Sequence, residues 1–133
     1  MRWKISIAML LLGLAATSTV QAASDDWMTD YDKALKKAAD ANKLALADFT
    51  GSDWCGWCVK LTNEVFKTPQ FKKWAAGHVV PLYLDFPRRT PQSAALKKQN
   101  RALAKKYGVR GFPTILFLTP DGGVVGRAGY VKG

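Results

Sequence analysis

The pattern of apolar and polar positions along the chain predicts helices that alternate with short strands. In several segments the apolar residues recur every three or four positions, as on one helix face, and other segments are short and apolar, as in buried strands. The predicted helices cover residues 30–41, 55–67, 69–77 and 91–107, and the predicted strands cover residues 44–49, 78–86, 114–119 and 124–128. Strands that alternate with helices and end in a hairpin indicate an α/β sandwich around a mixed sheet.

Two threonine–proline pairs predict where helices begin. Thr68 precedes Pro69, and Thr90 precedes Pro91. Threonine is a good N-cap, and proline suits the first helical position because its missing N–H would have no partner there. We therefore expect one helix to begin at each pair, and we expect Gly108 to end the second helix.

Pro81 predicts the place of its strand in the sheet. Proline cannot donate to a strand ladder, so a strand that contains it belongs at an edge or carries a bulge. Little of the chain precedes the first predicted helix once a signal peptide is removed, so no full strand is expected outside this one. We predict that residues 79–86 form an edge strand. The alternative is that residues 23–27 cover part of that edge, with Pro81 at a bulge.

The first residues have the pattern of a secretory signal peptide. Two basic residues precede an apolar stretch at 5–16, and Val20-Gln21-Ala22 has the small-residue pattern of a cleavage site. A membrane anchor is the alternative, but the stretch is shorter than the ~20 residues that span a bilayer. We expect residues 1–22 to be removed, leaving one domain at 23–133 without a stable membrane anchor. The mature protein would be in the periplasm or outside the cell.

The chain is strongly basic, with a formal net charge of +10. Eight basic residues and no acidic one lie between Arg88 and Arg110. A solvated helix face is the first interpretation of this run, and steering toward acidic partners or an anionic membrane surface is the second. Nucleic acid is not an expected partner, because the protein is expected to be exported and the run lacks interleaved aromatic residues.

Both cysteines of the chain lie in the segment Trp54-Cys55-Gly56-Trp57-Cys58. This segment falls between a predicted strand and a predicted helix, so Cys55 is expected at a helix N-terminus. The unpaired N–H groups and the helix dipole there favour the thiolate and lower the pKa of the thiol. Cys58, one turn further into the helix, is expected to be less exposed and to resolve the mixed disulfide that Cys55 forms.

Three other interpretations of the cysteine pair are weaker. A zinc site needs further ligands, and the only histidine, His78, stands alone, so we expect no metal. A c-type haem site needs histidine where Val59 stands. A purely structural disulfide remains open, although so small a loop removes little chain entropy and adds little stability.

Two motifs together resemble those of the thioredoxin superfamily. The first runs from Asp48 through Phe-Thr-Gly-Ser-Asp-Trp to the cysteine pair, and the second is Gly111-Phe112-Pro113-Thr114 before an apolar strand. The chain is most similar to exported thioredoxin-like proteins, from about Trp27 to its end. The resemblance implies a thioredoxin-like sandwich, in which a mixed central sheet is flanked by helices. Thioredoxins continue into a last helix beyond the position of Gly133, so we expect that helix to be missing.

The resemblance also implies an activity and its partners. The expected activity is thiol–disulfide exchange with protein disulfide substrates, without a cofactor, supported by a membrane-bound or soluble thiol electron donor. Gly56-Trp57 contains no cation to hold the thiolate, which favours a reductase or isomerase over an oxidase. The alternative is a non-catalytic thioredoxin-fold module that binds protein clients or carries a soft metal ion.

Site residues follow from the same resemblance. In the family the proline that matches Pro113 is cis, lies beside the cysteines and presents the backbone of Phe112 to an extended substrate chain. Trp54 and Trp57 flank Cys55 and are expected to shape the substrate groove.

Asp48 matches the buried acid that accepts or relays the proton of the second cysteine. The loop from Asp48 to Cys55 is one residue longer than in thioredoxin, and Pro81 stands near the place of the lysine that usually accompanies the acid. A buried acid without its cation tends to be protonated. Asp53 is interpreted as an exposed loop residue.

Overall fold

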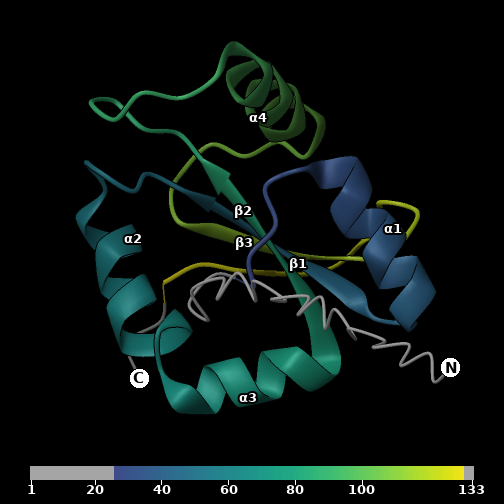
Figure 1. Ribbon diagram of the computed structural model, residues 1–133. Coiled ribbons are helices and arrows are strands. Elements are labelled where there is room, and N and C mark those ends of the chain that lie inside the picture. Colours follow the sequence, from purple (N-terminus) through teal and green to yellow (C-terminus); the bar gives the residue numbers. More distant parts are fainter. Residues whose placement is uncertain (1–25, 131–133) are drawn as a thin grey trace, which may run out of the picture.

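The computed structural model describes residues 26–130 and contains a four-stranded mixed sheet (Figure 1). The strands are β1 (Leu44–Thr50), β2 (Val79–Asp85), β3 (Thr114–Leu118) and β4 (Val124–Ala128), in the order β2-β1-β3-β4. β1 pairs with β2 in parallel and with β3 antiparallel, and β3 and β4 form an antiparallel hairpin. The predicted α/β sandwich with a mixed central sheet is confirmed.

Helices cover both faces of this sheet (Figure 1). They are α1 (Tyr31–Ala41), α2 (Gly56–Leu61), the π-helical turn η1 (Thr62–Phe66), α3 (Pro69–His78) and α4 (Ala94–Lys106). Within residues 26–130 no helix follows β4, and none is long and apolar enough to cross a membrane.

Two clusters of buried side chains place the helices on opposite faces. Alternate residues of a strand point to opposite faces of the sheet, so neighbours in β1 belong to different clusters. Ala45, Ala47 and Phe49 pack with residues of α1 and α4, whereas Leu46 packs with Leu61, Phe66 and Ala75 from α2, η1 and α3. The cysteine-bearing helix therefore covers the same face as η1 and α3.

The expected starts of two helices have different outcomes. Thr68 caps α3 as predicted, since its hydroxyl oxygen accepts the N–H of Phe71 at 3.2 Å. The helix predicted from Thr90-Pro91 instead begins at Ala94, with Ser93 as its N-cap, so that prediction is wrong. The N–H groups of residues 88–90 donate to the carboxylate of Asp53, which holds this stretch in a non-helical loop. Gly108 follows α4 with a φ of 63°, as expected for the residue after a helix.

The helix predicted at 55–67 is α-helical only in its first half. After Leu61 the chain widens into the π-helical turn η1, closed by the N–H of Lys67 donating to the carbonyl of Thr62 at 2.9 Å. A turn of this kind is frequent near functional sites. The apolar periodicity did not distinguish it from an α-helix.

β2 is the outermost strand of the sheet, as Pro81 predicted. Its pairing with β1 is continuous, so Pro81 is not at a bulge. Outside β2 only one isolated bridge is present in the described residues: the N–H of Met28 donates to Pro81 and the N–H of Tyr83 donates to Met28, at 2.9 and 2.7 Å. The Pro81 carbonyl faces this edge, so its missing N–H leaves no ladder bond unmade.

The predicted signal peptide, residues 1–22, lies outside the described residues. Its cleavage and the boundary of the mature domain at 23 remain predictions.

Candidate active site

The cysteine pair lies where β1 gives way to α2. Cys55 is the N-cap of α2 and is joined to Cys58 by a disulfide, with their Cα atoms 5.2 Å apart. The sulfur of Cys55 accepts the N–H of Cys58 at 3.2 Å, and the sulfur of Cys58 accepts the N–H of Gly51 at 3.5 Å. Cys55 is 6% exposed and Cys58 is 2% exposed. The predicted position at a helix N-terminus and the predicted order of exposure are confirmed.

Trp54 is fixed by contacts on several sides. Its indole N–H donates to the carbonyl of Phe86 at 2.7 Å, and its ring meets Phe112 edge-on with the centroids 5.7 Å apart. The guanidinium of Arg88 lies 3.8 Å from the ring centroid. A side chain at Gly51 would overlap the indole, so the ring needs glycine there. Trp54 therefore forms a rigid wall beside Cys55.

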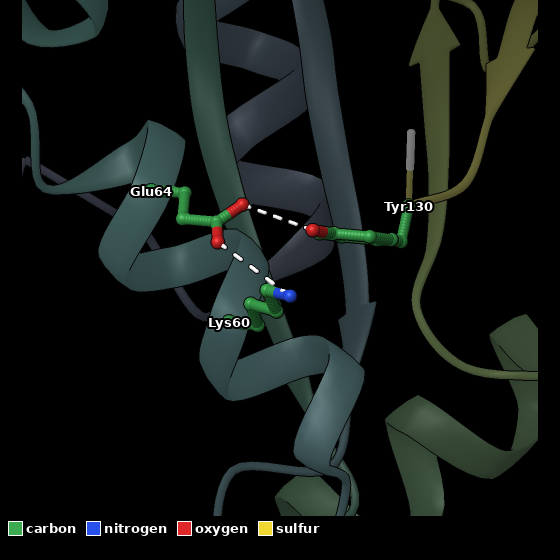
Figure 2. Close-up of polar contacts among 3 residues, drawn as sticks. All are labelled: Lys60, Glu64 and Tyr130. Atoms are coloured by element: carbon green, nitrogen blue, oxygen red, sulfur yellow. Dashed lines mark hydrogen bonds and ion pairs between the residues drawn. The ribbon is translucent and has the colours of Figure 1, made fainter. Parts of the chain in front are cut away.

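Trp57, in the first turn of α2, is 58% exposed. Its ring contacts Tyr130 with the centroids 4.9 Å apart, and the Lys60 ammonium lies 5.5 Å from it. Figure 2 shows Lys60 and Tyr130 both directed at Glu64: the Tyr130 hydroxyl donates to the carboxylate at 3.0 Å, and Lys60 pairs with it at 3.9 Å. The charge of Lys60 is thus compensated by its neighbour.

The loop before β3 adds a further side to the site. The bond between Phe112 and Pro113 is cis, as the resemblance implied. The Thr114 hydroxyl donates to the carbonyl of Gly111 at 2.7 Å, and the Phe112 ring packs on Phe86 as well as on Trp54. These contacts bring Phe112 beside the cysteine loop.

Asp48 is buried, with an exposed fraction of 2%. Its Oδ1 has no hydrogen-bond partner within the described part of the chain. Burial, and secondarily the charge of Asp85, raise the pKa of Asp48 to about 7. This agrees with the expectation that Asp48, without the lysine that accompanies the acid in the family, tends to be protonated.

Asp48 and Cys58 line two cavities that share some of their lining residues. Asp48 lines one of about 810 Å³, and Cys58 lines one of about 140 Å³. Thr62, Lys67 and Tyr83 line both. Asp48 and Cys58 therefore lie close to the same three residues, but the Oδ1 atom of Asp48 forms no hydrogen bond with Cys58.

Asp53 has a role that the sequence did not indicate. It is partly exposed, but its carboxylate accepts the N–H groups of Arg88, Arg89 and Thr90 at 2.9, 2.8 and 2.7 Å. These bonds, the one from Arg88 foremost, hold the pKa of Asp53 well below its usual range. No local pattern could have revealed this role, because the donors lie 35 to 37 positions away.

Further bonds tie the cysteine loop to the end of β2. Ser52 donates its N–H and its hydroxyl to the carboxylate of Asp85, at 2.9 and 2.6 Å. With Trp54 bound to Phe86 and Asp53 bound to residues 88–90, three consecutive loop residues are anchored to the last residue of β2 and to the segment that follows it. In Figure 1 this segment is the loop that leads from β2 to α4.

Comparison with known proteins agrees with this geometry. Residues 31–133 match the family model of the thioredoxin-like domain. The chain is 32% identical to the disulfide bond reductase DsbH of Chlamydia pneumoniae over 120 residues, which is 90% of this chain and 72% of that protein. It is also 32% identical to the thioredoxin-related protein DsbJ of the same organism, covering 92% of this chain but only 37% of DsbJ.

Solved structures give the same result. A structure of the DsbH oxidoreductase matches with a TM-score of 0.78 at 32% identity, covering 91% of this chain and 83% of that one. A putative disulphide-isomerase from Bacteroides thetaiotaomicron matches with a TM-score of 0.59 at 30% identity, covering 80% and 83%. With its cysteine pair at the start of α2, the chain belongs to the thioredoxin-like family and is a thiol–disulfide oxidoreductase.

Proposed function

We propose that the protein reduces disulfides of exported protein substrates, with Cys55 as the nucleophile and Cys58 as the resolving thiol. The observation that carries this proposal is the asymmetry of the pair. The sulfur of Cys55 caps α2 and accepts an N–H, which favours a thiolate in the reduced protein, whereas Cys58 lies deeper. The similarity to a protein named disulfide bond reductase supports the direction of the reaction.

The reaction transfers two electrons to the substrate in two exchanges. The Cys55 thiolate attacks one sulfur of the substrate disulfide, so that bond breaks, a mixed disulfide forms and the first substrate sulfur leaves and takes up a proton. Cys58 then loses its proton and attacks the sulfur of Cys55, which releases the second substrate sulfur as a thiol. The product is the Cys55–Cys58 disulfide, the state present in this structure. A thiol donor, soluble or in the membrane, restores the dithiol.

We assign Asp48 the role of taking the proton of Cys58. A carboxyl whose pKa is about 7 exchanges protons readily near neutral pH. The cavities lined by Asp48 and Cys58 share three lining residues, which supports a short route between the two groups.

We assign substrate binding to the surroundings of Cys55. An extended substrate chain would add beside the backbone of Phe112, next to Pro113, between the walls formed by Trp54 and Trp57. The contact between Trp54 and Phe112 supports this arrangement, because it joins the cysteine loop to the proline loop.

We propose that the protein is exported, because residues 1–22 have the pattern of a signal peptide, and that the mature domain begins at Ala23 and acts in the periplasm or outside the cell. N-terminal sequencing of the protein from fractionated cells tests this assignment. A mature protein that begins at Met1 would contradict it.

Turnover distinguishes this function from that of a binding module. With dithiothreitol as donor, the wild type is expected to reduce many equivalents of a protein disulfide such as insulin. Cys55→Ser should abolish turnover, and Cys58→Ser should accumulate a mixed disulfide through Cys55, because attack survives and resolution does not. Stoichiometric binding without turnover would favour the binding module. Full activity of Cys58→Ser without a Cys55 adduct would show that the roles are assigned wrongly.

A further inference from the structure

Arg88 is held in a defined position next to the cysteine loop. Its backbone N–H and those of the two following residues donate to both oxygens of the Asp53 carboxylate, two positions before Cys55. Hydrogen bonds to a charged acceptor are stronger than those between neutral groups. The main chain of Arg88 is therefore anchored directly to the loop that carries the nucleophile.

The side chain of Arg88 is positioned as well. Its guanidinium lies 3.8 Å from the centroid of the Trp54 ring, and Trp54 is itself fixed by its bond to the Phe86 carbonyl. A planar guanidinium stacks well on an indole face and keeps its N–H groups available at the edge. The same indole contacts Phe112, beside which we place the substrate chain.

Within the described part of the chain the Arg88 guanidinium forms no ion pair, since the Asp53 carboxylate accepts its backbone N–H and not its side chain. Within residues 26–130 the only ion pair is between Lys60 and Glu64 (Figure 2), and the Lys60 ammonium lies 5.5 Å from the centroid of the Trp57 ring. Both oxygens of Asp53 are engaged by backbone N–H groups. The two tryptophans therefore differ in their cations: Lys60 beside Trp57 is ion-paired with Glu64, whereas the Arg88 guanidinium on Trp54 forms no ion pair within residues 26–130.

The surroundings extend this positive charge away from the site. Arg89 and the basic residues of α4 are exposed, and no acidic residue lies between positions 88 and 110. Such a surface attracts acidic chains over a distance of about a Debye length, ~8 Å at physiological salt. At close range a guanidinium recognises a carboxylate through two parallel hydrogen bonds.

We propose that Arg88 is a specificity-determining residue, which selects target disulfides that have an acidic residue close to the attacked half-cystine. The inference rests on the proposed disulfide reduction. Arg88 acts on substrate binding and leaves the chemistry of the cysteines unchanged.

A matched set of disulfide peptides tests the proposal. The peptides differ only in the residue next to the target half-cystine, and this residue is Glu, Gln or Lys. For each peptide kcat/KM is measured with a thiol donor in excess. The wild type is expected to prefer the Glu peptide over the Gln peptide by about tenfold, and the Lys peptide should be the poorest substrate. The preference should shrink as salt is added.

Variants of single cations identify the residue responsible. Arg88→Gln should bring the Glu-to-Gln ratio to about one while kcat/KM for the Gln peptide stays within about twofold. Arg88→Lys keeps the positive charge but lacks the planar guanidinium that makes two parallel hydrogen bonds, so it should give an intermediate Glu-to-Gln ratio. Arg89→Gln, one position along the same loop, removes the same charge from a residue that does not stack on Trp54; it is the matched control and should lower the ratio by no more than about twofold.

Each outcome decides the matter. A wild type without preference for Glu, or an Arg88→Gln variant that keeps the wild-type ratio, overturns the specificity role while disulfide reduction stands. Failure of the wild type to reduce any of the peptides or a protein disulfide overturns the proposed function and this inference with it. Circular dichroism of Arg88→Gln establishes that the variant is folded, and the exposed position of Arg88 favours that result.

Discussion

Asp48 and Asp53 lie five positions apart, yet the fold gives their carboxyl groups opposite properties. Asp48, near the end of β1, is buried, its Oδ1 is unpartnered, and its pKa is raised to about 7. Asp53, in the loop before Cys55, is partly exposed, accepts three backbone N–H groups, and has a lowered pKa. One group is ready to exchange a proton near neutral pH, and the other is a permanent anion.

The difference shows that the supply of hydrogen-bond donors decides the state of each acid. Both residues are close in sequence to the cysteines, and the charge of an unpaired carboxylate is penalised by burial. Asp48 is buried, and its Oδ1 has gained no hydrogen-bond donor from the described residues. Asp53 keeps access to water and gains donors that stabilise its charge. A proton-exchanging role therefore suits Asp48, and an anchoring role suits Asp53.

The largest expected effect of breaking this contrast is on stability at high pH. The pKa of Asp48 is raised from its ordinary value of 3.8 to about 7. Between pH 4 and 7 the native state therefore keeps a proton on Asp48 that the unfolded state has already lost. Stability from this group is therefore present at low pH and falls as pH rises through about 7. Asp48→Asn mimics the protonated acid and should raise the free energy of unfolding at pH 8 by roughly 2–4 kcal/mol.

Urea unfolding of the wild type and Asp48→Asn at pH 4 and pH 8 measures this effect. Near pH 4 the two proteins should be almost equally stable, since both then have an uncharged side chain at position 48. A difference between them that does not grow with pH would contradict the raised pKa.

A smaller effect is expected from Asp53→Asn, and it is local. The amide is uncharged and has one acceptor oxygen in place of two, so at least one of the three N–H groups loses its acceptor and the others donate to a weaker one. Amide hydrogen exchange at Arg88, Arg89 and Thr90 should accelerate roughly tenfold. The preference of the enzyme for acidic peptides should fall as Arg88 loses its anchor.

Exchange in β1 serves as the control for Asp53→Asn. Strand amides such as that of Ala47 should be unaffected, because the anchored loop lies outside the core of the sheet. Unchanged exchange at all three loop amides would mean that Asp53 does not anchor them.

The contrast between the two acids also explains what could be predicted from the sequence. Asp48 lies in an apolar strand and matches a buried acid of the family, so its burial could be expected from the resemblance, as could the presence of Pro81 near the place of the family's lysine. Pro81 and Thr68 were informative because a missing N–H and a cap are properties of one position. The α/β sandwich and the place of Cys55 followed from periodicity and spacing.

Features that depend on distant parts of the chain were not predictable in this way. Thr90-Pro91 has the local form of a helix start, but the bonds from residues 88–90 to Asp53 displace the start of α4 to Ala94. The widening of the helix at η1 likewise has no recognisable pattern in the sequence. At the start of α4, contacts between distant segments override a local preference.

The smallest expected effect is on the stability of two tryptophan variants. They compare Trp54, in the anchored loop, with Trp57, on the exposed surface. Trp54 belongs to the loop that Asp53 anchors, and its indole N–H donates to Phe86. Trp54→Phe removes this bond and should lower the free energy of unfolding by about 1 kcal/mol. Trp57→Phe changes a side chain that is 58% exposed, and the free energy of unfolding should move by no more than about 0.5 kcal/mol. Urea unfolding at one pH compares the pair directly. Equal losses in the two variants would mean that the loop next to Asp53 is no more firmly held than the surface around Trp57.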